Sequence, residues 1–162
     1  MHSLRLPTID DIDLGNRRTL VRVDFNGPIG EGGSILDDAR IKAHIPTIKK
    51  LLDNGAGVVL VTHQGRPGGR DFISLHPHRE LLSKYLGSEV RFIEDVIGPA
   101  AIQAIKSVKQ GDVLLLDNVR FVSEEMIESS PEVQSRTHLV RRLSQHFNYF
   151  IFDAFATAHR SQ

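Results

Sequence analysis

Residues 148–160 read Asn-Tyr-Phe-Ile-Phe-Asp-Ala-Phe-Ala-Thr-Ala-His-Arg, and the expected fold follows from how this run is built. Its first five residues are mostly aromatic or β-branched, which predicts a short buried strand over 148–152. Asp153 is the first charged residue after that strand, and His159 and Arg160 follow closely. Such a change from apolar to charged residues is typical of the carboxyl end of a parallel sheet, where ligands of open α/β folds bind.

Four more apolar runs precede this one, at 19–23, 57–62, 90–93 and 113–116. All five are continuous rather than alternating, which is typical of strands covered on both faces, as in parallel sheets. Segments of helical period lie between them. The sequence therefore predicts an open, doubly wound, Rossmann-like α/β domain, with a parallel sheet of at least five strands and helices on both faces.

The helical segments carry their own start and stop signals. Pro46 falls inside the first segment, which predicts a short turn before it and a main helix that begins there. A second helix is expected to end at Gly87, and a third to cover 99–108. A fourth is expected to begin after Ser130 and to continue one apolar stripe as far as Phe147.

The composition is that of a single globular domain over residues 1–162, with 40% apolar and 25% charged residues. The lack of cysteine excludes disulfides and thiolate chemistry. Basic and acidic residues balance at 20 each, so net charge does not favour nucleic acid or an anionic membrane as a partner. Without a signal-like N-terminus or a long apolar run, the expected location is cytoplasmic.

Polar side chains follow four of the five expected strands. They are Asp24 and Asn26 after the first, His63 and Arg66 after the second, Asn118 and Arg120 after the fourth, and Asp153, His159 and Arg160 after the fifth. Because the carboxyl ends of parallel strands share one edge, these residues are expected to converge, with Arg40 beside them. Several guanidinium groups around one cavity indicate a small, multiply charged anion such as a phosphorylated acid.

Structural roles compete with this interpretation at some positions. For Arg22, Arg70 and Arg79, an ion pair or a helix cap is the preferred interpretation. Of the two aspartates that follow strands, Asp24 is the better candidate for a ligand group. Asp153 is equally well interpreted as a structural residue.

The histidines and glycines give no sign of a metal site or a nucleotide fingerprint. His76 and His78 flank a proline and are typical of a solvated helix start. No pair of histidines has zinc-ligand spacing on one helical face, so no metal is expected. The glycine-rich segment 28–33 matches neither a dinucleotide fingerprint nor a phosphate loop, which favours a flexible turn.

Five motifs, in the same order along the chain, resemble segments of the N-terminal domain of the phosphoglycerate kinase family. They lie at 21–28, 40–48, 62–67, 115–121 and 153–160. That family has two doubly wound α/β lobes joined by a hinge, with 3-phosphoglycerate on the first and magnesium–nucleotide on the second. The resemblance implies that this chain is the substrate-binding lobe, lacks the C-terminal nucleotide-binding domain, and does not itself bind Mg²⁺ with ATP or ADP.

The resemblance also implies a role for each candidate residue. Asp24 and Asn26, with Phe25 between them, would hold the hydroxyl and carboxylate end of 3-phosphoglycerate, and Arg40 would be the catalytic residue. The remote phosphate would be bound by a basic set with polar neighbours. That set is His63, Gln64, Gly65, Arg66, Arg120, His159 and Arg160.

The implied reaction is direct in-line phosphoryl transfer between the carboxylate of 3-phosphoglycerate and ADP or ATP, a step of glycolysis. The residue types are consistent with a direct transfer, because no serine has a plausible histidine and acid partner to make it a nucleophile. Such a transfer needs only that the substrates are positioned and that the charge of the transition state is stabilised. The chain alone is expected to bind 3-phosphoglycerate without turnover. A stand-alone anion-binding or regulatory domain, and a different phosphate-handling enzyme complete at this size, are the alternatives.

Three positions depart from the pattern of the family. Gly27 stands where valine is usual, Asp117 where glutamate is common, and Ala156 where glycine is common. Because alanine resists the positive φ that glycine adopts freely, Ala156 is the departure with the clearest expected effect on the backbone.

Overall fold

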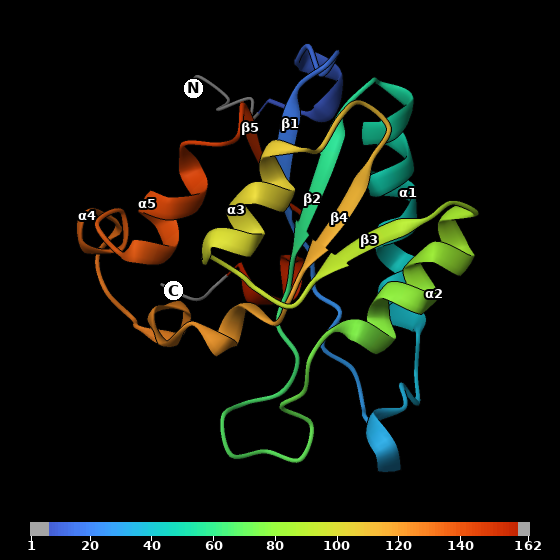
Figure 1. The fold of residues 1–162 in the computed structure, drawn as a ribbon, viewed down its shortest axis with the longest axis vertical. Helices are drawn as coiled ribbons and strands as arrows, with labels where there is room; N and C mark the ends of the chain where they lie inside the picture. The colour runs from blue at the N-terminus through green and yellow to red at the C-terminus, as the bar shows by residue number, and fades with distance from the viewer. Residues whose placement is uncertain (1–6, 159–162) are drawn as a thin grey trace, which may run out of the picture.

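A computed structural model describes residues 7–158 and confirms a parallel sheet with helices on both faces (Figure 1). The strands are β1 (Arg18–Arg22), β2 (Gly57–Val61), β3 (Val90–Ile93), β4 (Val113–Leu116) and β5 (Tyr149–Phe152). They lie in the order β3-β4-β2-β1-β5, and every neighbouring pair is parallel. All five expected strands are present, and their carboxyl ends share one edge. The prediction that the last of them is buried was wrong, because β5 lies at the edge of the sheet with Phe150 59% and Phe152 49% exposed.

The chain places its helices on the two faces by changing direction once along the sheet. It moves from β1 to β2 and β3 through α1 (Ala39–Asp53) and α2 (His76–Leu86), which cover one face. It then returns through α3 (Pro99–Lys106) to β4, and through α4 (Pro131–Gln134) and α5 (His138–Ser144) to β5. Since crossovers are right-handed, the reversal puts α3 and α5 on the opposite face, as Figure 1 shows.

The first helix differs from the prediction of a start at Pro46. It runs unbroken from Ala39 to Asp53, with Pro46 inside it. Ile41 and Ile45, in the turns before the proline, are buried in the core against the sheet. Their packing outweighs the backbone hydrogen bond that the proline removes, and it brings Arg40 into the first helical turn.

The segment before β5 forms two short helices where one was predicted. The side chain of Ser130 accepts a hydrogen bond from the Val133 N–H at the start of α4, and Thr137 does the same for Val140 at the start of α5. Because each N-cap starts a new helix, the segment forms α4 and α5 instead of one continuous helix. Of the expected stripe, Leu143 is buried, whereas Val133 and Val140 are 51% and 37% exposed.

Short 3-10 turns occupy several connections. They are η1 (Ile9–Asp11), η2 (Glu31–Gly33), η3 (Val119–Phe121), η4 (Ser123–Met126) and η5 (Phe155–Thr157). The turn η4 buries Glu125 within 123–130, a stretch rich in serine and glutamate. Ala156 lies in η5, and among the described residues other than glycine only Asn16 has a positive φ, so the alanine causes no strain there.

None of the helices within residues 7–158 combines the length and the apolar character that crossing a membrane requires.

Candidate functional site

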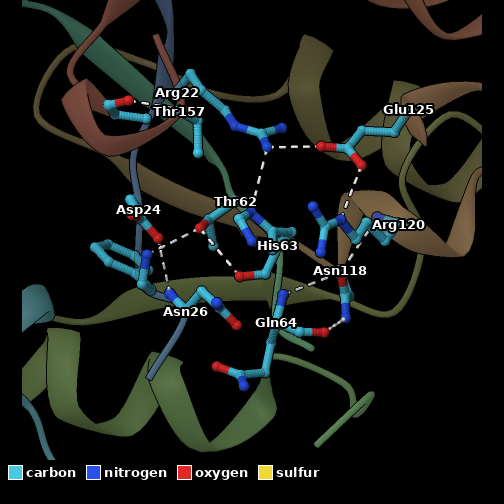
Figure 2. A network of polar contacts seen from close by, with 12 residues as sticks. Arg22, Asp24, Asn26, Thr62, His63, Gln64, Asn118, Arg120, Glu125 and Thr157 are labelled. Carbon is cyan, nitrogen blue, oxygen red and sulfur yellow. Dashed lines mark hydrogen bonds and ion pairs between the residues drawn. The ribbon is translucent and has the colours of Figure 1, made fainter. Parts of the chain in front are cut away.

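Most of the candidate residues meet at the carboxyl edge of the sheet, as the topology predicted. Figure 2 shows the network, in which most residues come from the segments directly after β1, β2 and β4, and Thr157 comes from η5, after β5. They are Asp24 and Asn26 after β1, Thr62, His63 and Gln64 after β2, and Asn118 and Arg120 after β4, joined by Arg22 from β1 and Glu125 from η4.

Asp24 and Arg40 form an ion pair between the end of β1 and the first turn of α1. Arg40 Nη1 donates to Asp24 Oδ2, and the backbone N–H of Asn26 donates to Oδ1 at 3.1 Å. The carboxylate is 7% exposed, while the Arg40 side chain is 52% exposed. A guanidinium carries five N–H donors, so most of those of Arg40 remain open to an anion in the solvent.

Gly65 ties together the segments after β1, β2 and β4. Its N–H donates to Asn26 Oδ1 at 2.9 Å, and its carbonyl accepts from Arg120 Nη1 at 2.7 Å. Its φ is +68°, and a Cβ at this position would lie 2.5 Å from the backbone of Asp71. Only glycine fits both constraints, so this residue fixes the close approach of the loop to Arg120.

Glu125 bridges two arginines and was not found from the sequence. Its Oε1 accepts from Arg22 Nη2 at 2.7 Å, and its Oε2 accepts from Arg120 Nε at 3.1 Å. Arg22 Nη2 also lies 3.4 Å from His63 Nδ1. Arg22 therefore has the structural ion pair that was expected, but next to a candidate phosphate ligand. Two nitrogens of Arg120 donate hydrogen bonds, and Nη2 donates none to a residue within 7–158.

Two candidate residues have side chains buried behind the site. Gln64 Oε1 accepts from the Gly27 N–H at 3.2 Å, and Nε2 donates to the Gly27 carbonyl at 3.0 Å. The Phe25 ring packs against the rings of His44 and His78, with centroids 5.6 and 6.5 Å away. The side chains of Gln64 and Phe25 therefore hold the loops after β2 and β1 in place and are not themselves open to a ligand.

Asn118 holds the loop after β4 against the loop after β2. Its Oδ1 accepts from the backbone N–H of Gln64 and of Arg120, at 3.3 and 3.2 Å. Its Nδ2 donates to the carbonyls of Gln64 and Ile73, at 2.7 and 2.9 Å. The neighbouring Asp117, a departure from the family pattern, accepts from the Leu75 N–H at 2.8 Å, so its role is structural.

The remaining candidates lie apart from this network. Arg66 follows Gly65 on the exposed part of the loop, and its side chain has no partner within residues 7–158. His159 and Arg160 lie outside the described residues. Arg79 donates from Nε to the carbonyl of Val90 in β3 at 3.0 Å, so its role is structural, although this contact is neither the ion pair nor the helix cap that was expected. Asp153 Oδ2 lies 2.7 Å from His44 Nδ1 and so also has a structural contact.

The prediction of a solvated helix start was wrong for His78. The residue lies in the first turn of α2, but on the inner face, where it is fully buried. Its Nε2 lies 3.3 Å from Gln64 Oε1. Burial lowers the pKa of His78 from 6.5 to about 4, because the charged form loses its hydration.

His78 is expected to make stability depend on pH. Its folded pKa is below its unfolded value, so the unfolded chain takes up the proton first as pH falls from about 6.5 to about 4. Stability falls over that window by about 3 kcal/mol and is constant for this group below it. Urea unfolding at pH 7, 5 and 4 measures the effect.

The matched variants for that measurement are His78→Gln and His76→Gln. The first removes the titrating group and is expected to flatten the slope between pH 6.5 and 4. The second changes an exposed histidine two residues away and is expected to keep it. Equal slopes in both variants would contradict the assignment to His78.

A pocket of about 390 Å³ lies on the β5 side of Arg22 and Arg120. Phe150 and Phe152 contribute an apolar wall, and Glu124 and Glu125 place carboxylates in the lining. Because the two carboxylates offset the two arginines, this pocket suits an anion less well than the edge beside Arg40. Within the described residues, no group of three histidine, aspartate or glutamate side chains is placed to hold a metal ion.

Comparisons with known proteins agree with the motifs. The family model described as phosphoglycerate kinase matches residues 9–162. The phosphoglycerate kinase of Saccharolobus solfataricus is 53% identical over 162 residues, which is 100% of this chain and 40% of that protein. The phosphoglycerate kinase of Sulfurisphaera tokodaii is 52% identical over 160 residues, which is 98% of this chain and 39% of that protein.

A solved structure has the same fold as this chain. The crystal structure of phosphoglycerate kinase from Pyrococcus horikoshii has a TM-score of 0.92 at 43% identity, and the match covers 95% of this chain and 38% of that one. The chain thus spans about 40% of the length of the curated relatives quoted above. On these matches, together with the shared fold, the chain belongs to the phosphoglycerate kinase family.

Proposed function

We propose that residues 1–162 are the N-terminal substrate-binding domain of a phosphoglycerate kinase and bind 3-phosphoglycerate at the carboxyl edge of the sheet. The observation that carries the proposal is the half-exposed Arg40, paired with buried Asp24 where three strands end. The reaction is the glycolytic transfer of a phosphoryl group between ATP or ADP and 3-phosphoglycerate or 1,3-bisphosphoglycerate. Its cytoplasmic location remains a prediction.

Asp24 and Arg40 are proposed to have different roles at the reacting end of the substrate. The Asp24 carboxylate has free lone pairs that accept a hydrogen bond from the substrate hydroxyl, and Asn26 lies beside it. The open N–H donors of Arg40 stabilise the charge that spreads over the phosphoryl oxygens in the transition state. Because the transfer is direct, these residues position the substrate and stabilise the transition state, and they form no covalent intermediate.

The remote phosphate is proposed to lie at the basic set that follows β2 and β4. Arg66 has a free guanidinium in the loop that Gly65 fixes, and Arg120 has Nη2 left for a further bond. His63 lies next to Arg22 at the same edge. His159 and Arg160 are proposed to complete the set from the last motif, outside the described residues.

The nucleotide is proposed to bind elsewhere in the protein. Mg²⁺ with ATP or ADP is held by phosphate oxygens together with one or two carboxylates, and the resemblance to the family assigns that site to the second lobe. The relatives extend well beyond the matched 40% of their length, and we assign the nucleotide-binding domain, the partner of this chain, to that remainder. No nucleic acid or membrane is proposed as a partner.

A reconstitution assay tests this function. The chain is mixed with, or fused to, the unmatched remainder of the Saccharolobus solfataricus relative, and ADP formation from ATP and 3-phosphoglycerate is measured. Neither part alone is expected to turn over, whereas the combination is. Turnover by the chain alone would contradict the proposal. Binding of 3-phosphoglycerate without activity in any combination would favour a stand-alone anion-binding or regulatory domain instead.

A further inference from the structure

His44 connects three elements of the candidate site. It lies on α1, one turn after Arg40, and its ring is buried. Its Nε2 accepts from the backbone N–H of Asp24 at 3.1 Å, after β1. Its Nδ1 lies 2.7 Å from Asp153 Oδ2, after β5. Both ring nitrogens are therefore used, and each faces a different strand end.

The two partners select one tautomer of the neutral ring. A backbone N–H can only donate, so His44 Nε2 must present its lone pair to Asp24. A neutral imidazole then carries its proton on Nδ1, and Asp153 accepts it. The carboxylate thus selects the Nδ1–H tautomer and holds the plane of the ring, as carboxylates do for histidines that bind metals.

The hydrogen bond between the Asp24 N–H and His44 fixes the position of the end of β1 relative to α1. The N–H groups of Val23 and Phe25 bond to the Val61 carbonyl and to Thr62 Oγ1, so they tie the end of β1 to β2. The N–H of Asp24 bonds instead to His44 and so ties β1 to α1. Arg40 and His44 are four residues apart and share one face of that helix.

We propose that His44 and Asp153 are positioning residues for phosphoryl transfer. They fix the backbone of Asp24, and through it the Asp24–Arg40 pair that faces the reacting phosphoryl group. Asp153 opens the motif that ends in Arg160, so the same contact couples the last motif to Arg40. The inference rests on the proposed function for its kinetic part, whereas the geometry it requires exists without ligand.

The first test is made on the unliganded chain. Long-range nitrogen–proton spectra of histidine-labelled protein are expected to show His44 as the Nδ1–H tautomer, and the Asp24 amide to be protected from hydrogen exchange. His44→Ala and Asp153→Ala should each speed exchange at Asp24, by about tenfold for the loss of one buried hydrogen bond. An Nε2–H tautomer would overturn the inference.

The second test uses the reconstituted enzyme. His44→Ala and Asp153→Ala are expected to lower kcat about tenfold or more with a smaller change in KM, because Arg40 is displaced from the reacting group. Asp153→Asn keeps an oxygen that accepts from Nδ1–H and should restore most of kcat. Ile48→Ala, a buried residue of α1 outside the site, should lower thermal stability and leave kcat unchanged.

The outcomes separate this inference from the proposed function. If the unmodified chain neither binds 3-phosphoglycerate nor supports turnover, the proposed function is wrong, and the kinetic role of His44 is wrong with it. If the unmodified enzyme is active and His44→Ala, once shown to be folded, has the same kcat, the inference alone is overturned. Loss of kcat in Asp153→Ala with rescue in Asp153→Asn supports it.

Discussion

Glu125→Ala is expected to lower the free energy of unfolding by about 3–5 kcal/mol, the cost of leaving buried charges without their partner. Arg22, Arg120 and Glu125 have side chains that are 15%, 4% and 7% exposed, so the two guanidinium groups would lose their shared counter-charge in a mostly dehydrated site. Urea unfolding at pH 7 measures the change. The same variant should weaken 3-phosphoglycerate binding, since Arg120 loses the contact that orients Nε.

Two further variants make that result specific. Glu125→Gln keeps a hydrogen-bond acceptor but not the charge, so its effect should lie between those of the unmodified chain and Glu125→Ala. Glu128→Ala removes an exposed acid three residues later and should change stability by less than about 0.5 kcal/mol. If Glu125→Ala were no less stable than Glu128→Ala, the bridge would not hold the two arginines.

Arg40→Ala is expected to slow phosphoryl transfer in the reconstituted enzyme by about 10³-fold, as removal of an arginine that stabilises phosphoryl transfer does. The Arg40 side chain is 52% exposed, so its loss should change kcat far more than stability. Arg40→Lys keeps the charge and loses the planar fork, and should recover only part of the rate. Coupled ADP-release kinetics and thermal melts measure the two effects.

Lys42→Ala is the matched control for Arg40. Lys42 lies two residues later on the same helix, is exposed, and pairs with Asp38 at 2.9 Å. Its removal should leave the transfer rate within about twofold of the unmodified enzyme, because surface ion pairs contribute little. If both variants slowed the reaction equally, the role assigned to Arg40 would be a general effect of positive charge on α1.

The strands and the edge they define could be predicted because their signal is local. Continuous apolar runs identify the strands, although not the exposure of Phe150 and Phe152 in β5, and parallel topology then brings Asp24, Asn26 and Arg120 to one edge. The limits of α1 could not be predicted, because the burial of Ile41 and Ile45 overrides the local effect of Pro46. Two separate N-caps likewise divide a segment that periodicity alone reads as one helix.

The supporting residues of the site were missed for a related reason. Glu125 pairs with Arg22 across 103 positions of sequence, and His44 pairs with Asp153 across 109. No spacing pattern marks such partners. Glu125 stands in a polar stretch that looks like solvent-exposed loop, and His78 flanks a proline at a helix start that is ordinarily solvated. Only the packed fold shows that these polar groups are buried and paired.

Calorimetric titration of the chain with 3-phosphoglycerate, for Arg66→Ala and Arg70→Ala beside the unmodified protein, tests the central claim most directly. Both arginines are exposed in the same loop, so their replacement should leave the fold intact. We predict binding at one site, about tenfold weaker in Arg66→Ala and unchanged in Arg70→Ala, since a charge-assisted bond to phosphate is lost only in the first. No binding by the unmodified chain, or equal affinity in the two variants, would contradict the assignment of the substrate site to this edge of the sheet.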